Sequence, residues 1–116
     1  MATSYTKLAE NLTVTYASPN LPFYTQAVSM NGANAVQVNL VIYNRTAAET
    51  LACAVQGSND LENWAPVTTS GGTSLALGFA SPSASAIAWQ YVRLAFTAGG
   101  SATFFLSVGL STAQLG

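Results

Sequence analysis

Ala35-Val-Gln-Val-Asn-Leu-Val-Ile-Tyr-Asn44 is the stretch of sequence that decides the fold. Every second residue in it is aliphatic, and these residues are Val36, Val38, Leu40 and Ile42. The residues between them are Gln37, Asn39, Val41 and Tyr43. A period of two is typical of a β-strand that buries one face. Because the second face is only partly polar, we expect it to be covered as well.

The same alternation recurs on both sides of this stretch. Leu21 to Met30 is expected to be extended, and Asn31-Gly32 after it is a strong turn signal. Further strands are expected over residues 11–16, 51–55, 65–69, 75–79, 89–97 and 104–110. Clusters of Gly, Pro, Asn and Ser separate these segments and favour turns between them.

These segments predict the fold class. No helical pattern lies between the expected strands, so crossovers between parallel strands are not expected. We predict an all-β fold, an antiparallel, jelly-roll-like β-sandwich of seven or eight short strands, with residues 1–116 as a single domain. A closed barrel with the same strands would give the same pattern, because a period of two reports one buried face and not closure of the sheet.

Charged residues are scarce in this chain. Half of its 116 residues are hydrophobic and 6% are charged, and the net charge is −1. About a quarter of the residues are charged in a typical soluble domain. So little charge gives weak repulsion between copies in solution. We therefore expect the chain to associate with itself.

The sparse charge also argues against two classes of partner. The basic residues are Lys7, Arg45 and Arg93, too few to neutralise several phosphates, so nucleic acid is not an expected partner. No apolar run reaches the roughly 18 to 20 residues that span a bilayer, so a membrane is not expected either. Residues 1–10 lack the apolar segment of a signal peptide, and we expect a chain made in the cytoplasm.

Two resemblances add to this interpretation. Val55-Gln-Gly-Ser-Asn-Asp-Leu-Glu-Asn-Trp64, followed by Tyr91-Val-Arg-Leu94 and the expected strand over 104–110, resembles discoidin (coagulation factor type C) domains, with Leu61 where that family usually has Gly. This resemblance covers roughly the last 60 residues. It implies a jelly-roll β-sandwich that binds a glycan or a cell surface. In overall character, the chain also resembles bacteriophage capsid and head-decoration proteins.

The sequence lacks the groups of a catalytic centre. It contains no histidine, the commonest general base and transition-metal ligand. Cys53 lies between two alanines in an expected strand, and we predict a buried thiol without a base to activate it. We therefore expect no enzyme, no catalytic residue and no cofactor.

Asp60 and Glu62 are the only close pair of carboxylates. With amide oxygens from Asn59 or Asn63 they could form a weak Ca²⁺ site. The alternative is that Asp60 caps the turn through its side chain while Glu62 is solvated. We favour the turn cap and predict no metal site.

Aromatic residues supply the candidate binding or interface positions, which are Tyr43, Trp64, Trp89 and Tyr91. Trp64 and Trp89, with Tyr91 near in sequence, could form a platform for a sugar or a partner. The alternative is that both tryptophans fill the core or its rim. Tyr43 lies on the partly polar face that we expect to meet another subunit. For Arg93 we expect an ion pair with one of the four acids.

Two functional hypotheses follow. The first is a non-enzymatic structural protein that self-assembles as a homo-oligomer, a virion component such as a capsid or head-decoration protein, with other virion proteins as further partners. Edge strands without lysine favour it, because exposed edges pair with neighbours unless they are blocked. The second is a discoidin-like module that binds a glycan or a cell surface. The first hypothesis predicts localisation to a virion.

Overall fold

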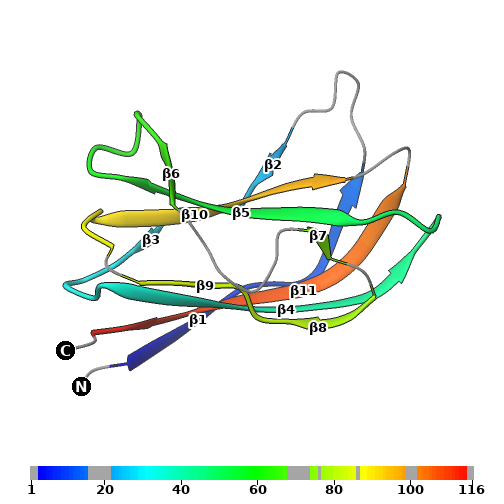
Figure 1. The fold of residues 1–116 in the computed structure, drawn as a ribbon, viewed down its shortest axis with the longest axis horizontal. Coiled ribbons are helices and arrows are strands. Elements are labelled where there is room, and N and C mark those ends of the chain that lie inside the picture. The colour runs from blue at the N-terminus through cyan, green and yellow to red at the C-terminus, as the bar shows by residue number, and fades with distance from the viewer. Residues whose placement is uncertain are drawn as a thin grey trace.

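The computed structural model describes residues 3–15, 22–67, 74–75, 77–85, 87–98 and 102–114. These residues form two antiparallel β-sheets that lie face to face as two layers (Figure 1). No strand belongs to both sheets, so the described part of the chain is a β-sandwich and not a closed barrel. Within these residues there is no helix with the length and hydropathy to cross a membrane.

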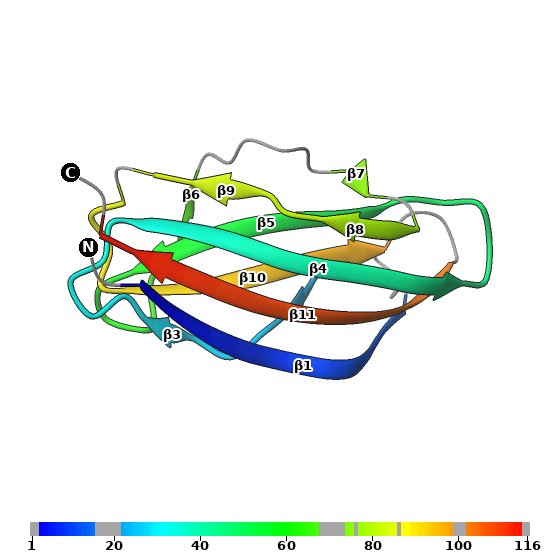
Figure 2. The same ribbon diagram turned by 90° about the horizontal axis from the view of Figure 1, so that it is seen from below.

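The first sheet contains five strands. Its order is β1 (Thr3–Thr15), β11 (Thr103–Ala113), β4 (Ala35–Arg45) and β8 (Gly78–Ala80), and β9 (Ser83–Ala84) also pairs with β4. Figure 2 shows β1, β11 and β4 running side by side as long, curved strands. The stretch that opened the sequence analysis is therefore an inner strand of this sheet.

The second sheet contains six shorter strands. Its order is β2 (Phe23–Tyr24), β10 (Tyr91–Ala98), β5 (Leu51–Ser58) and β6 (Ala65–Val67), while β3 (Val28–Ser29) pairs with β10 and β7 (Ser74–Leu75) pairs with β5. β5 and β6 form the hairpin expected around residues 57–64, with Val55 opposite Val67. The predicted return strand extended to Thr69, and residues 68–69 lie outside the described part of the chain.

The core lies between the two sheets and comes from alternate residues, as the period of two requires. The predicted inner face of β4 is buried, and so is the inner face of β10. The largest fully buried side chains are Phe96, Phe104, Met30, Leu40, Ile42, Leu51, Leu94, Leu106, Leu110, Val14, Val38 and Val55. Tyr16, expected to continue the inner face after Val14, lies outside the described residues.

The eleven described strands exceed the seven or eight that we predicted. β1 begins at Thr3, although alternation is visible only from residue 11, because two irregularities in its pairing with β11 break the period. The extended segment Leu21 to Met30 contains two separate short strands, β2 and β3. Residues 81–85, expected as a loop, contain β9, which pairs with β4 through Val36 and Ala84.

The single strand expected over residues 75–79 would place Leu75, Leu77 and Phe79 on one face, and this prediction is wrong. Leu75 is buried in β7 of the six-stranded sheet, whereas Phe79 points outward from β8 of the five-stranded sheet. The chain changes sheets between them, and Gly78 adopts a φ of +112°, which only glycine reaches readily. A change of sheet breaks the link between spacing in the sequence and the face a residue occupies.

Candidate functional site

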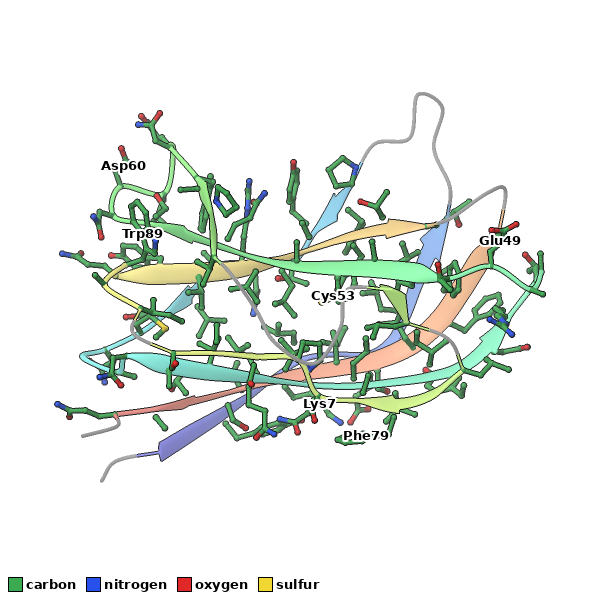
Figure 3. The ribbon with its side chains drawn as sticks, viewed as in Figure 1. Lys7, Glu49, Cys53, Asp60, Phe79 and Trp89 are labelled. Carbon is green, nitrogen blue, oxygen red and sulfur yellow. The ribbon has the colours of Figure 1, made fainter. Side chains whose placement is uncertain are left out.

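The outer face of the five-stranded sheet carries large apolar side chains. Val41 on β4 is paired with Phe79 on β8, and both are exposed, Phe79 to 67%. Figure 3 shows Phe79 on the side of this layer that faces away from the other sheet. Tyr5 on β1 and Tyr43 on β4 add two further exposed rings. We call these four residues, Tyr5, Val41, Tyr43 and Phe79, the apolar face.

Tyr43 is held across the sheet by a feature of β1. Pairing between β1 and β11 is irregular between Ala9 and Leu12, which leaves Glu10 outside the regular ladder. The carbonyl oxygen of Glu10 accepts hydrogen bonds from the hydroxyls of Tyr43, at 2.8 Å, and of Ser107. The Tyr43 hydroxyl also lies 3.2 Å from the carbonyl oxygen of Leu106. Tyr43 therefore lies flat over β11 and leaves part of its ring exposed.

Tyr5 is placed by a glycine on the neighbouring strand. Gly109 on β11 has the Tyr5 ring directly over it, where a β-carbon would overlap the ring and hydroxyl. Tyr5 stays 55% exposed in this position. The Tyr5 ring therefore packs directly on the backbone of β11.

The five-stranded sheet carries few charges. Its strands contain Lys7, Glu10 and Arg45 as charged residues. Lys7 and Glu10 form an exposed ion pair at 3.8 Å on β1, and Arg45 donates a 2.8 Å hydrogen bond from Nη1 to the carbonyl oxygen of Glu49 at the end of β4. The part of the face around Val41 and Phe79, on β4 and the edge strand β8, therefore has no formal charge among the described strands.

The outer face of the six-stranded sheet carries an arginine that stacks on two aromatic rings. The guanidinium carbon of Arg93 on β10 lies 3.9 Å from the centroid of the Tyr24 ring and 4.2 Å from that of the Trp64 ring. Its Nε donates a 2.8 Å hydrogen bond to Oε1 of Gln56, the residue opposite it on β5. The ion pair expected for Arg93 is not formed with any described acid, because the two rings and Gln56 occupy its surroundings. We call Tyr24, Gln56, Trp64 and Arg93 the arginine platform.

The four aromatic residues singled out from the sequence do not form one site. Tyr43 is on the five-stranded sheet, whereas Trp64 and Tyr91 belong to the other layer. Tyr91 is half-buried on β10, two residues from Arg93, with Ser58 and Ser29 as its strand partners. Tyr91 and Trp64 therefore flank the same stretch of sheet.

Trp89 packs at the end of the core. Gly57 is buried on β5, and a β-carbon on it would overlap the Trp89 side chain, so the tryptophan packs directly on its backbone. Trp89 is half-buried against the core, as the interpretation of a rim residue predicts. Beside it, Met30, Asn31, Asn34 and Tyr91 line part of an open pocket of about 480 Å³. Trp89 and Tyr91 are thus neighbours at this end of the sandwich.

Asp60 caps the turn between β5 and β6. Its Oδ1 accepts hydrogen bonds from the backbone N–H groups of Asn63, at 2.8 Å, and Glu62, at 2.9 Å. Oδ2 accepts a third from the Asn63 side chain, at 2.7 Å. These bonds, the backbone N–H of Asn63 first, hold the pKa of Asp60 below its usual range. No group of metal-ligating side chains is found among the described residues.

The other candidate for chemistry, Cys53, lies between the two sheets (Figure 3). It is buried and unpaired with another cysteine. Burial raises its thiol pKa to about 12, which disfavours the thiolate that a nucleophile or metal ligand needs. Cys53 is therefore a core residue, as the sequence predicts.

Tyr24, Gln56, Tyr5 and Phe79 were missed as surface residues of interest. The neighbours of Arg93 come from three separate segments, and strand register brings them together. Alternation places Gln56 and Arg93 on strands but does not show that they are opposite each other. For Tyr24, the available signal was the pair of consecutive aromatic residues Phe23-Tyr24.

Comparison with known proteins shows the fold. No model of a known protein family matches the sequence, and no curated protein matches it. The SPBc2 prophage-derived protein YomS is similar with a TM-score of 0.64 and 10% identity, over 96% of this chain and 92% of that chain. VP2 in the infectious bursal disease virus subviral particle is similar with a TM-score of 0.65 and 11% identity, over 97% of this chain and 32% of that chain.

A third similar structure belongs to another functional class. Chitosan-binding module 1 of a chitosanase/glucanase from Paenibacillus sp. IK-5 has a TM-score of 0.50 and 17% identity, over 93% of this chain and 99% of that chain. These structures place the chain among jelly-roll-like β-sandwich proteins. At identities of this size the likeness is one of fold, and it extends both to viral proteins and to a carbohydrate-binding module. The finer resemblance to discoidin domains stays a prediction.

Proposed function

We propose that this chain is a non-enzymatic structural protein that assembles with copies of itself, as a capsid or decoration component of a virion. The observation that carries the proposal is the apolar face, where Phe79 is 67% exposed beside Val41. Contiguous exposed apolar patches in soluble proteins mark interaction sites. Aromatic residues and few charges are also typical of the buried part of a protein interface.

The occupant that we propose for the apolar face is a second copy of the chain. Two sheets stack face to face when their side chains interdigitate, and a two-fold axis brings the same patch together from both copies. The Lys7–Glu10 pair lies on β1 at the sheet edge, which corrects the expectation of edge strands without lysine, and its charges can stay hydrated at the rim. With a net charge of −1, the chain offers little repulsion against such contact.

The assignment to a virion draws on the similar structures. One derives from a prophage, and the other is the VP2 protein of a viral subviral particle. Their likeness in fold supports the proposal, since the sandwich of VP2 is found in a subviral particle. The proposed partners are copies of this chain and, in a virion, its other proteins.

The assembly proposal predicts that Phe79→Lys dissociates the protein. A lysine at position 79, on the edge strand β8, would replace the exposed ring with a charge that has no partner in the interface, which weakens the association. Size-exclusion chromatography with light scattering should give a multimer for the unmodified chain and a monomer for the variant. Ala54→Lys is the matched control, because Ala54 is exposed on β5 of the other sheet. Equal masses for Phe79→Lys and the unmodified chain would contradict the proposal.

A second candidate function, glycan binding, is favoured by the arginine platform. Its rings are partly exposed and rigidly placed, and aromatic faces of this kind pack against the C–H face of a sugar. This function predicts binding on a glycan array that Trp64→Ala abolishes and Phe79→Lys leaves intact. Array binding that survives Trp64→Ala unchanged would remove the platform as the site.

A further inference from the structure

We infer that the arginine platform binds a sugar that carries a carboxylate, with Arg93 as the contact for the acid group. The inference rests on the second candidate function, glycan binding, and specifies the ligand class of that same site. It starts from the conformation of the Arg93 side chain in the structure.

The Arg93 guanidinium is fixed in position and orientation. Tyr24 lies over one part of it at 3.9 Å, and Trp64 lies within 4.2 Å. The hydrogen bond from Nε to Gln56 sets the direction in which the group points. Cation–π contacts stabilise such a stacked guanidinium, and the rotamer freedom that binding would otherwise remove is already restricted.

The remaining donors of Arg93 are unused. Its terminal nitrogens form no hydrogen bond or ion pair with the described residues, and the side chain is only half-buried. Two parallel N–H groups of a guanidinium match the two oxygens of a carboxylate. The unused donors of Arg93 therefore match a carboxylate that lies in the plane of the guanidinium, between the two rings.

Two of the four acids of the chain are already engaged within it and are poor partners for Arg93 in a second copy. Asp60 accepts four hydrogen bonds within the turn, and Glu10 is paired with Lys7. A phosphate polymer is also a poor fit, because it needs several basic residues and the platform has one. A small acid presented on a ring fits both the single guanidinium and its aromatic walls.

The side chains beside the platform are small, which leaves room for a sugar ring. Ala54 on β5 is exposed next to Gln56, and exposed Pro66 on β6 is the strand partner of Gln56. Small side chains here leave the Tyr24 and Trp64 rings as the largest groups of the platform. A pyranose can pack its apolar face on a ring while its carboxylate reaches Arg93.

The test is isothermal titration calorimetry of the full chain with two matched pairs of sugars. The pairs are trigalacturonic acid with α-1,4-galactotriose, and sialyllactose with lactose. We expect at least one acidic sugar to bind roughly tenfold or more tightly than its neutral counterpart, which is the effect of a charge-assisted hydrogen-bond pair. Added salt should weaken the binding of the acidic sugar and leave the binding of the neutral sugar unchanged.

Variants at two arginines locate the acid contact. Arg93→Gln should remove the preference for the acidic sugar, and Arg93→Lys should keep only part of it, because lysine retains the charge without the paired donors. Arg45→Gln is the matched control, since it removes the same charge from the end of β4 on the other sheet. Thermal unfolding of each variant confirms that it is folded.

The outcomes separate the two proposals. Equal binding of acidic and neutral sugars, lost in Trp64→Ala, would overturn the carboxylate inference and leave glycan binding standing. An acid preference that survives Arg93→Gln and Arg93→Lys would also overturn it. No binding of any of the four sugars would overturn both the inference and the second candidate function. Self-association through the apolar face is measured independently of all of these.

Discussion

Gly57 and Gly109 each lie under an aromatic side chain, yet the two contacts differ in how far the ring can move. Trp89 packs over Gly57 and against the core, where neighbouring side chains confine it. Tyr5 lies over Gly109 on the outer face and is 55% exposed. A close-packed core transmits overlap to its neighbours, whereas an exposed side chain can turn into solvent.

We therefore predict different costs for the same substitution at these two glycines. Gly57→Ala should lower the free energy of unfolding by about 1–3 kcal/mol, the range for added volume in a packed site. Gly109→Ala should change it by less than about 1 kcal/mol, because Tyr5 can move and alanine suits a strand better than glycine. Urea denaturation measures both. Equal losses would show that Trp89 is not held as a core-rim residue.

At the scale of elements, the β5–β6 turn is a self-contained unit. Ser58 Oγ accepts hydrogen bonds from the backbone N–H groups of Asp60 and Leu61, at 3.2 and 3.0 Å. The Asp60 side chain in turn accepts hydrogen bonds from the N–H groups of the next residues in the turn. Asn59 Oδ1 accepts the backbone N–H of Gln90 at 3.0 Å, which ties the turn to the segment before β10. Leu61 adopts a φ of +64°, a conformation that favours glycine, the residue usual at this position in the family it resembles.

The turn gives the protein an acid-sensitive contribution to stability. The pKa of Asp60 is lowered in the folded state, so its contribution is complete above the unfolded value of about 4 and is lost as pH falls below it. We expect the urea midpoint of the unmodified protein to fall between about pH 4 and pH 2, and to fall less in Asp60→Asn.

Glu62→Gln is the control for this titration, because the Glu62 side chain makes no hydrogen bond to the described residues of the turn. It removes a carboxylate of the same turn and should keep the acid slope of the unmodified protein. An identical slope in Asp60→Asn would contradict the assignment of Asp60 as the cap.

Strands with an unbroken alternation could be predicted from the sequence, whereas the irregular first part of β1 and most of the short strands could not. Alternation located β4, β5, β10 and β11 because each has several consecutive pairs of a buried and a less buried position. A strand of two residues, such as β7, has no period to detect. The outward position of Tyr43 followed from alternation, but the contact of Arg93 with Tyr24 and Gln56 depends on register between distant segments.

At the scale of the whole molecule, the two outer faces of the sandwich have different chemistry. The five-stranded sheet presents the apolar face, whose four residues carry no formal charge, and the six-stranded sheet presents a stacked arginine whose terminal nitrogens form no hydrogen bond with the described residues. Self-association through the apolar face would leave the arginine platform exposed. One small sandwich can therefore serve as a building block and still offer a site for ligands.

The most direct test of the central claim, that the apolar face is covered by a second copy, is the mass of the unmodified chain in solution. Sedimentation equilibrium over the micromolar range should give a multiple of the 12.0 kDa chain mass. Dissociation on dilution, with a mass that depends on concentration, would agree with that result. A single species of 12.0 kDa throughout the range would contradict the account.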